Sequence, residues 1–174
     1  MIFLCTDDHW GRSVVNQIAH QYFIHTLNLG VRIAAENGEI SGASGVVDVL
    51  RPDASCLWCR QALRSERIAA ESMPRSRRKE LEAEGYVEGL DVPAPAVISL
   101  NTVVAGLAVT QFLQLVTDFM AAPGDIERLN YDPMTGLVRR GRTTPMSECV
   151  CRQVRAYGDL RAMPLQSDLS FLDH

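Results

Sequence analysis

Two pairs of cysteines, far apart in the chain, constrain the fold more than any other feature. Cys56 and Cys59 form a C-x-x-C pair, and Cys149 and Cys151 form a C-x-C pair. Without export, paired cysteines indicate metal or redox chemistry before structural disulfides. Four thiols suffice for a closed tetrahedral zinc site, which would join two strand-like segments roughly 90 residues apart. We therefore expect structural zinc, with free thiols or a redox-active Cys56–Cys59 pair as alternatives.

The N-terminal stretch predicts a short strand followed by an amphipathic helix. Residues 1–5 are mostly apolar, and Thr6 to Asp8 offer side chains that commonly cap helices. Apolar residues then recur at helical spacing over 9–22, which gives this helix a face for the core.

The polar residues around the start of this helix have two possible roles. Ligands of open α/β sheets collect beyond the carboxyl ends of strands, where Asp7 could hold Mg²⁺ against phosphate oxygens. Arg12 could neutralise a phosphate or a carboxylate, and Asn16 lies one turn further along the same face. Alternatively, Asp7 and Asp8 only cap the helix, at about 1 kcal/mol each. The spacing alone leaves both roles open.

The middle of the chain carries two hairpin signals. Asn37-Gly38 separates two strand-like runs, and a two-residue turn of suitable twist needs positive φ at both positions. Residues 126–142 predict a second hairpin, with D-P-M-T-G at 132–136 as its turn.

Two helical regions complete the predicted fold. Residues 61–90 contain a charged helical pattern broken at Pro74, typical of short surface helices or of a lid. Residues 98–120 form a long helix that is apolar on most of its circumference, so we expect it to be buried between layers or at a subunit interface. The element order predicts a mixed α/β fold. No G-x-G-x-x-G turn is present, so no phosphate cradle of that kind lies in these residues.

Composition excludes two broad classes of function. The net charge is −4, and the basic run R-S-R-R-K is followed by E-L-E-A-E, which cancels its field. Nucleic-acid binding therefore has little support. Polar residues interrupt the most apolar window, 94–120, which argues against a membrane span. We find no leader peptide and expect a cytoplasmic protein.

The run C-T-D-D-H-W-G-R-S-V-V-N (Cys5–Asn16) resembles the C-T-D-N-x-x-x-R-x-x-x-N signature of the ThiF, MoeB and HesA adenylyltransferases, which belong to the ubiquitin-activating-enzyme-like superfamily. The resemblance covers about residues 1–160, and the matching segments follow in the family's order. These segments are L-G-V-R-I, G-V-V-D-V-L-R-P, C-L-W-C, A-P-A-V-I-S-L-N and C-V-C.

The resemblance implies a Rossmann-like α/β domain, usually dimeric, that binds Mg-ATP. Such enzymes transfer AMP to the C-terminal carboxylate of a ubiquitin-like or sulfur-carrier protein, and a short peptide is a further possible acceptor. Carried over residue by residue, Asp7 would bind magnesium and act with Arg12 in catalysis, while Asp8 and Asn16 would contact the nucleotide. The four paired cysteines would hold zinc, although the family's usual second pair is C-x-x-C rather than C-x-C.

Two departures from the family pattern affect the expected function. The family's glycine-rich first half has no counterpart here, so we expect a partial domain over 1–160, a crossover or lid region over 61–90 and a tail over 161–174. We interpret the chain as a fragment or the product of a misassigned start. Residues 60–148 contain no cysteine, so adenylation without a thioester step is expected. Cys5 is expected to be a buried core thiol.

The sequence therefore leaves two main hypotheses. The first is the C-terminal portion of a ThiF-like adenylyltransferase, which alone could be inactive. The second is a non-catalytic, zinc-stabilised module for dimerisation or for docking a carrier protein. A glycine-rich βα unit encoded directly upstream of Met1 would favour the enzyme.

Overall fold

The computed structural model describes residues 1–37, 39–74, 76–77, 97–120 and 126–160. The strands are β1 (Ile2–Leu4), β2 (Thr26–Glu36), β3 (Glu39–Leu50), β4 (Arg128–Asp132) and β5 (Leu137–Gly141). The helices are α1 (His9–Gln21), α2 (Ser65–Glu71), α4 (Ile98–Thr117) and α5 (Val150–Gln153), followed by a 3-10 turn at Gly158–Leu160. The mixed α/β class is confirmed.

The five strands form one sheet in the order β1-β2-β3-β4-β5. Only β1 and β2 are parallel, and α1 connects them, so the described residues contain a single βαβ unit. Both predicted hairpins are confirmed. Glu36 pairs with Glu39 around the Asn37-Gly38 turn, and Asp132 pairs with Leu137 around the second turn. Asn37 has a φ of 53°, the positive value that this turn requires.

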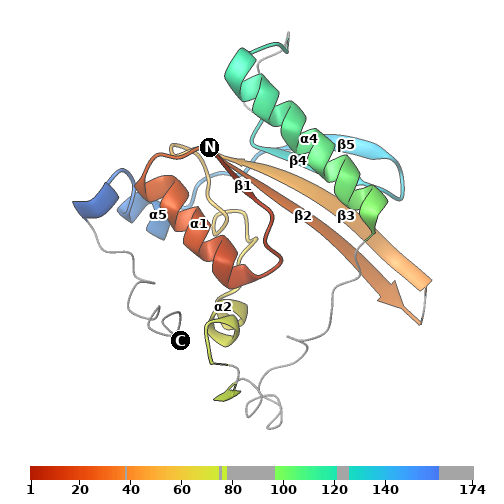
Figure 1. The fold of residues 1–174 in the computed structure, drawn as a ribbon, viewed down its shortest axis with the longest axis horizontal. Coiled ribbons are helices and arrows are strands. Elements are labelled where there is room, and N and C mark those ends of the chain that lie inside the picture. The colour runs from red at the N-terminus through yellow and green to blue at the C-terminus, as the bar shows by residue number, and fades with distance from the viewer. Residues whose placement is uncertain (38, 75, 78–96, 121–125, 161–174) are drawn as a thin grey trace.

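Helices α4 and α1 lie on opposite faces of the sheet (Figure 1), and each face carries a separate core. On one face, Leu27 and Val47 pack against Val104 and Ala108 of α4. On the other face, Leu4 and Leu50 pack against the segment after β3, with Val15 of α1 beside them. This division follows from the alternation of side chains along a strand.

Helix α4 differs from its prediction. Only Val104, Ala108 and Gln111 are buried, whereas Val103, Val109 and other apolar residues are exposed. Burial of this helix between two layers is therefore wrong within the described part of the chain, whereas burial at a subunit interface stays a prediction. The helix ends at Thr117, because Asp118 adopts a left-handed conformation with φ 50°. By length and composition alone α4 could cross a membrane, but a single such helix packed on a sheet is not a convincing span.

The predicted region 61–90 is described only in part. Helix α2 ends at Glu71, shortly before Pro74, as the sequence pattern indicated. The remainder of the predicted lid, from 78 to 90, and the predicted tail at 161–174 lie outside the described residues.

Candidate functional site

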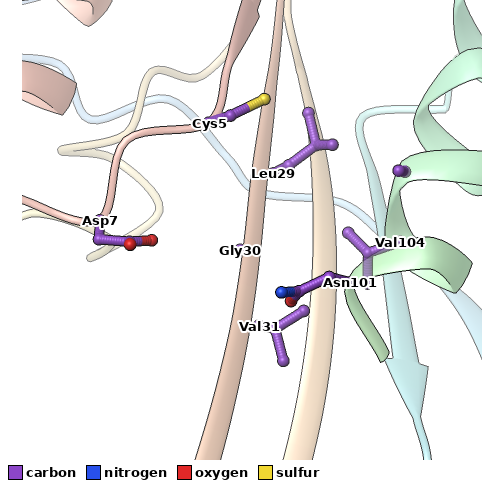
Figure 2. Close-up of a pocket in the computed structure, with 8 residues that line it drawn as sticks. Cys5, Asp7, Leu29, Gly30, Val31, Asn101 and Val104 are labelled. Carbon is purple, nitrogen blue, oxygen red and sulfur yellow. The ribbon is translucent and has the colours of Figure 1, made fainter. Parts of the chain in front are cut away.

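A cavity of about 330 Å³ lies where the chain leaves β1. Figure 2 shows the carboxylate of Asp7 and the amide of Asn101 pointing toward this space from opposite sides of β2. The lining residues come from the β1–α1 loop (Cys5, Asp7), from β2 (Leu29, Gly30, Val31) and from α4 (Asn101, Val104, Ala105). We call this space the β1-end cavity. It lies beyond the carboxyl end of a parallel strand, where ligands of α/β sheets commonly bind.

Asp7 and Cys5 reach this cavity because β1 stops after three residues. Asp7 is exposed, so its carboxylate is accessible to solvent and to a cation. Cys5 is exposed as well, and the expectation that it is a buried core thiol is wrong. The sequence predicts a strand through Cys5, whereas β1 ends at Leu4, so the Cys5 side chain lies on the cavity wall.

Arg12 holds the loop before α1 against β2. Its Nε donates to the carbonyl oxygen of Thr6 at 2.9 Å, and its Nη2 donates to the carbonyl oxygen of Leu29 at 3.2 Å. The guanidinium therefore lies beside Gly30, with its positive charge near the β1-end cavity. The expected contact with phosphate stays a prediction.

Asp8 and Asn16 have local partners in the structure. Asp8 is the N-cap of α1, and its carboxylate accepts a hydrogen bond from the backbone N–H of Gly11. Asn16 is 2% exposed, and its Oδ1 accepts from the backbone N–H of Leu57 at 2.8 Å. The structure thus shows a capping role for Asp8 and a packing role for Asn16. Their predicted contacts with a nucleotide stay predictions.

The four paired cysteines meet in one buried cluster, which we call the four-cysteine cluster. Their sulfur atoms all lie within 4.8 Å of one another, and Cys56 Sγ is 3.7 Å from Cys59 Sγ and 3.4 Å from Cys149 Sγ. Cys149 and Cys151 are 3.2 Å apart at sulfur, so the C-x-C spacing brings both thiols into the cluster. Zn–S bonds of about 2.3 Å in a tetrahedron place sulfurs about 3.8 Å apart. Small adjustments would therefore admit zinc, although the identity of the metal stays a prediction.

The thiols differ in their affinity for protons. Hydrogen bonding from Cys151, reinforced by other groups of the cluster, lowers the pKa of Cys56 to about 5 despite its burial. Burial raises the pKa of Cys149 to about 11, and the pKa of Cys151 is also raised because its thiol donates to Cys56. One thiolate next to thiols that retain their protons is a suitable starting state for a metal that displaces protons on binding.

A buried charge cluster connects the C-x-x-C loop to the sheet. The carboxylate of Asp48 on β3 is fully buried and accepts from Arg60 at 3.0 Å, from Arg128 at 2.6 Å and from Asn28 at 2.9 Å. Arg60, directly after Cys59, also donates to the carbonyl oxygen of Val49. This Asp48 cluster was not predicted from the sequence. The signal was a single aspartate inside the apolar run G-V-V-D-V-L, since a buried charge needs partners.

The fold and the cavity together define a mixed α/β domain with a candidate cysteine metal site. No family model matches the sequence, and no curated protein sequence matches it. Two solved structures of Escherichia coli MccB have a similar fold. The structure of MccB with MccA-N7isoASN aligns with a TM-score of 0.57 and 13% identity over 86% of this chain and 40% of that chain. The structure of MccB with selenomethionine MccA gives a TM-score of 0.54 and 11% identity over 86% and 38%.

These likenesses show the fold alone. The chain spans about two fifths of the length of MccB, so most of that protein has no counterpart here.

Proposed function

We propose that this chain is part of an ATP-dependent adenylyltransferase that forms an acyl-adenylate on the C-terminal carboxylate of a protein or peptide. One observation carries the proposal: Asp7 projects into a cavity at the carboxyl end of β1, in a domain whose fold is like that of MccB. The structures of MccB contain MccA, which supports a peptide among the possible acceptors.

The donor atoms around the cavity suit magnesium and phosphate. Magnesium prefers oxygen ligands and commonly uses one or two carboxylates together with phosphate oxygens. Asp7 offers such a carboxylate, and Asn101 offers an amide oxygen on the opposite wall. The Arg12 guanidinium beside Gly30 adds positive charge close by. These residues fit Mg-ATP at its phosphate end.

In the proposed reaction, an oxygen of the acceptor carboxylate would attack the α-phosphorus of ATP, and pyrophosphate would be the leaving group. Asp7 would hold the magnesium ion, and Arg12 would stabilise the negative charge that develops on the phosphate oxygens. Asp8 would position both residues by fixing the start of α1. No covalent step on a cysteine is included, because adenylation needs none.

Zinc, if bound, would have a structural role in this protein. The four-cysteine cluster supplies all four ligands of a tetrahedral site, so no position remains for a substrate. The metal would join Cys56 after β3 to Cys149 near α5. A redox role for Cys56 and Cys59 would instead require a reversible disulfide and no bound metal.

Calorimetric titration of the purified chain with Mg-ATP tests the proposal. We expect binding to weaken at least tenfold, about 1.4 kcal/mol, in Asp7→Ala. Asp53→Ala is the matched control, because Asp53 is an exposed carboxylate away from the cavity. Equal binding by Asp7→Ala and the control would refute the magnesium role of Asp7.

The competing function is a non-catalytic module for dimerisation or carrier-protein docking. The exposed apolar face of α4 would be a suitable surface for either role. Lack of Mg-ATP binding by the chain, together with a stable dimer in sedimentation, would favour that function.

A further inference from the structure

Helix α1 contacts both of the segments that carry the paired cysteines. Its residue His20 is 1% exposed, and the Nδ1 atom of the imidazole lies 3.4 Å from the carbonyl oxygen of Pro52, shortly before Cys56. The main-chain carbonyl oxygen of His20 accepts a hydrogen bond from the N–H of Ala156 at 3.1 Å, shortly after Cys151. A single buried residue therefore connects the chain on one side of the four-cysteine cluster to the chain on the other side.

The neighbours of His20 on α1 strengthen both connections. Asn16 precedes His20 by one helical turn, so the two side chains lie on the same face of the helix. That face contacts the C-x-x-C loop, because the Oδ1 atom of Asn16 accepts from the N–H of Leu57. At the end of the helix, Gln21 donates to the carbonyl oxygen of Gly158 at 2.6 Å. The end of α1 thus contacts the chain that follows α5, and the two helices lie side by side (Figure 1).

The main chain at Ala156 adopts a conformation that needs such support. Ala156 has a φ of 63°, in the left-handed region that alanine rarely occupies. Backbone in a sparsely populated conformation persists where surrounding contacts determine it. The hydrogen bond to His20 is one such contact, and it fixes the direction in which the chain leaves the C-x-C pair.

Contacts of this kind favour joint binding of a metal by the two cysteine pairs. Cys56 and Cys149 are 93 positions apart in the sequence, so a metal that joined them in a loose chain would have to close a long loop. Contacts that hold the thiols together before binding lower this entropic cost and raise the affinity for the metal. His20 can act in this way on both pairs, because it contacts both segments without being one of the four ligands.

We propose that His20 is a positioning residue for a metal ion in the four-cysteine cluster. Through Pro52 and Ala156 it holds the C-x-x-C loop and the chain after the C-x-C pair in the arrangement that lets both pairs bind one ion. The contact with Pro52 requires a proton on Nδ1, because a carbonyl oxygen only accepts hydrogen bonds. The inference rests on metal binding by the cluster, and it does not depend on adenylation.

Competition between the metal-free, reduced 174-residue chain and a chromophoric chelator would measure zinc affinity. His20→Leu keeps the bulk of the side chain but removes the donor to Pro52, and we expect zinc binding to weaken at least tenfold, to about the extent seen when groups that orient metal ligands are removed. His20→Asn places an amide N–H close to the position of Nδ1, so this variant should bind zinc within about threefold of the unchanged protein.

The matched control is Ser13→Ala on the same helix. Ser13 is 6% exposed, and its hydroxyl donates to the carbonyl oxygen of Trp10, so the change affects a buried part of α1 without touching either cysteine segment. We expect this variant to bind zinc within about twofold of the unchanged protein.

Cobalt(II) gives a readout that a merely structural role would not change. Thiolate ligands of cobalt absorb by charge transfer in the near ultraviolet, in proportion to the number of Co–S bonds. At saturating cobalt we expect a lower absorbance per bound ion in His20→Leu, and full absorbance in His20→Asn and Ser13→Ala. Equal spectra and equal zinc affinities in all three variants would overturn the inference, whatever urea unfolding shows about their stability.

Hydrogen exchange of the unchanged protein decides the inference even if His20→Leu fails to fold. If His20 holds the chain before the metal binds, the Ala156 amide is protected from exchange in the metal-free chain as well as in the zinc-loaded chain. Rapid exchange of this amide in the metal-free chain would overturn the inference.

The outcomes also separate this inference from the proposed function. Weaker zinc binding by His20→Leu in a chain that does not bind Mg-ATP would support the inference and refute the adenylation. Failure of the unchanged protein to bind zinc or cobalt would overturn the inference together with the metal site, and it would leave the test of Asp7 unaffected.

Discussion

Asn16 on α1 accepts a hydrogen bond from the backbone N–H of Leu57, which lies between the two cysteines of the C-x-x-C pair. The helix that begins beside the β1-end cavity and the loop that holds two of the four clustered cysteines are therefore joined at a buried point. Any metal that orders the loop also restrains α1. Through Arg12, α1 in turn restrains the strand that lines the cavity.

Removing the side-chain oxygen of Asn16 should destabilise this junction. Asn16→Ala leaves the Leu57 N–H without its acceptor, and we expect a loss of about 1–3 kcal/mol of unfolding free energy in urea. Gln17→Ala, one residue further on a less buried part of α1, should change it by less than about 0.5 kcal/mol. If Asn16→Ala instead kept full stability but lost Mg-ATP binding, the residue would be a nucleotide contact as first predicted.

The four-cysteine cluster should bind one metal ion per chain. We expect elemental analysis to find zinc in the unchanged protein and to show its loss in Cys149→Ser, with Cys5→Ser as the control that retains it. Because the pKa of Cys149 is raised to about 11 and that of Cys151 is raised as well, both must lose protons on binding at neutral pH. Zinc affinity should therefore fall as pH is lowered. Metal-free protein with a reversible Cys56–Cys59 disulfide would show a redox pair instead.

Substitution of Asp48 should destabilise the fold more than substitution at most other positions of the chain. Asp48→Asn removes the negative charge that faces Arg60 and Arg128, which leaves two buried or half-buried guanidinium groups uncompensated. We expect a loss of about 3–5 kcal/mol. The control Asp53→Asn alters an exposed pair with Arg51 at 3.7 Å and should cost less than about 1 kcal/mol. Comparable losses in the two variants would contradict a structural role for the Asp48 cluster.

Local signals explain which parts of the fold could be predicted. Asn37-Gly38 and D-P-M-T-G determine their own turns, and the cap at Asp8 depends on residues within one helical turn. The paired cysteines predicted their own cluster, because few arrangements of four thiols are chemically suitable and a tetrahedral metal site is one of them. The partners of Asp48 were not predictable, since Arg60 and Arg128 are 12 and 80 residues away in sequence. The role of Asn16 was also missed, because its partner is a main-chain group on a distant loop.

Helix α4 shows a further limit of predicting tertiary contacts from the sequence. Hydrophobicity indicated that much of the helix is covered, but the described structure covers only the face around Val104 and Ala108. A sequence pattern indicates that a surface is apolar, but it does not indicate which element packs on that surface. The β1-end cavity was likewise only partly predicted: a ligand-binding role was predicted for Asp7, whereas none was predicted for Asn101.

The contact between β3 and α4 can be tested at a glycine. A Cβ atom at Gly45 would lie 2.5 Å from Cγ2 of Val104 and 3.3 Å from the Tyr131 ring. Gly45→Ala should therefore push α4 off the sheet, at a cost of about 1–3 kcal/mol, and alter the cavity that Val104 lines. Gly42→Ala on the same strand has no atom within 4 Å of the new Cβ and is the matched control. Equal stability of both variants would mean that α4 does not pack here as described.

His9 should make the stability depend on pH near the start of α1. Burial lowers the pKa of its imidazole below the ordinary 6.5, Glu71 opposes this shift, and Arg12 adds to it. Between the folded pKa and about 6.5, the unfolded chain binds more protons than the folded chain, so stability rises with pH across that window. The contribution is complete above about pH 6.5 and is lost as the pH falls toward the folded pKa.

Urea unfolding at about pH 5, 6 and 7 tests this expectation. The free energy of unfolding should depend less steeply on pH in His9→Gln than in the unchanged protein. An unchanged slope in His9→Gln would show that the imidazole is as accessible in the folded chain as in the unfolded one.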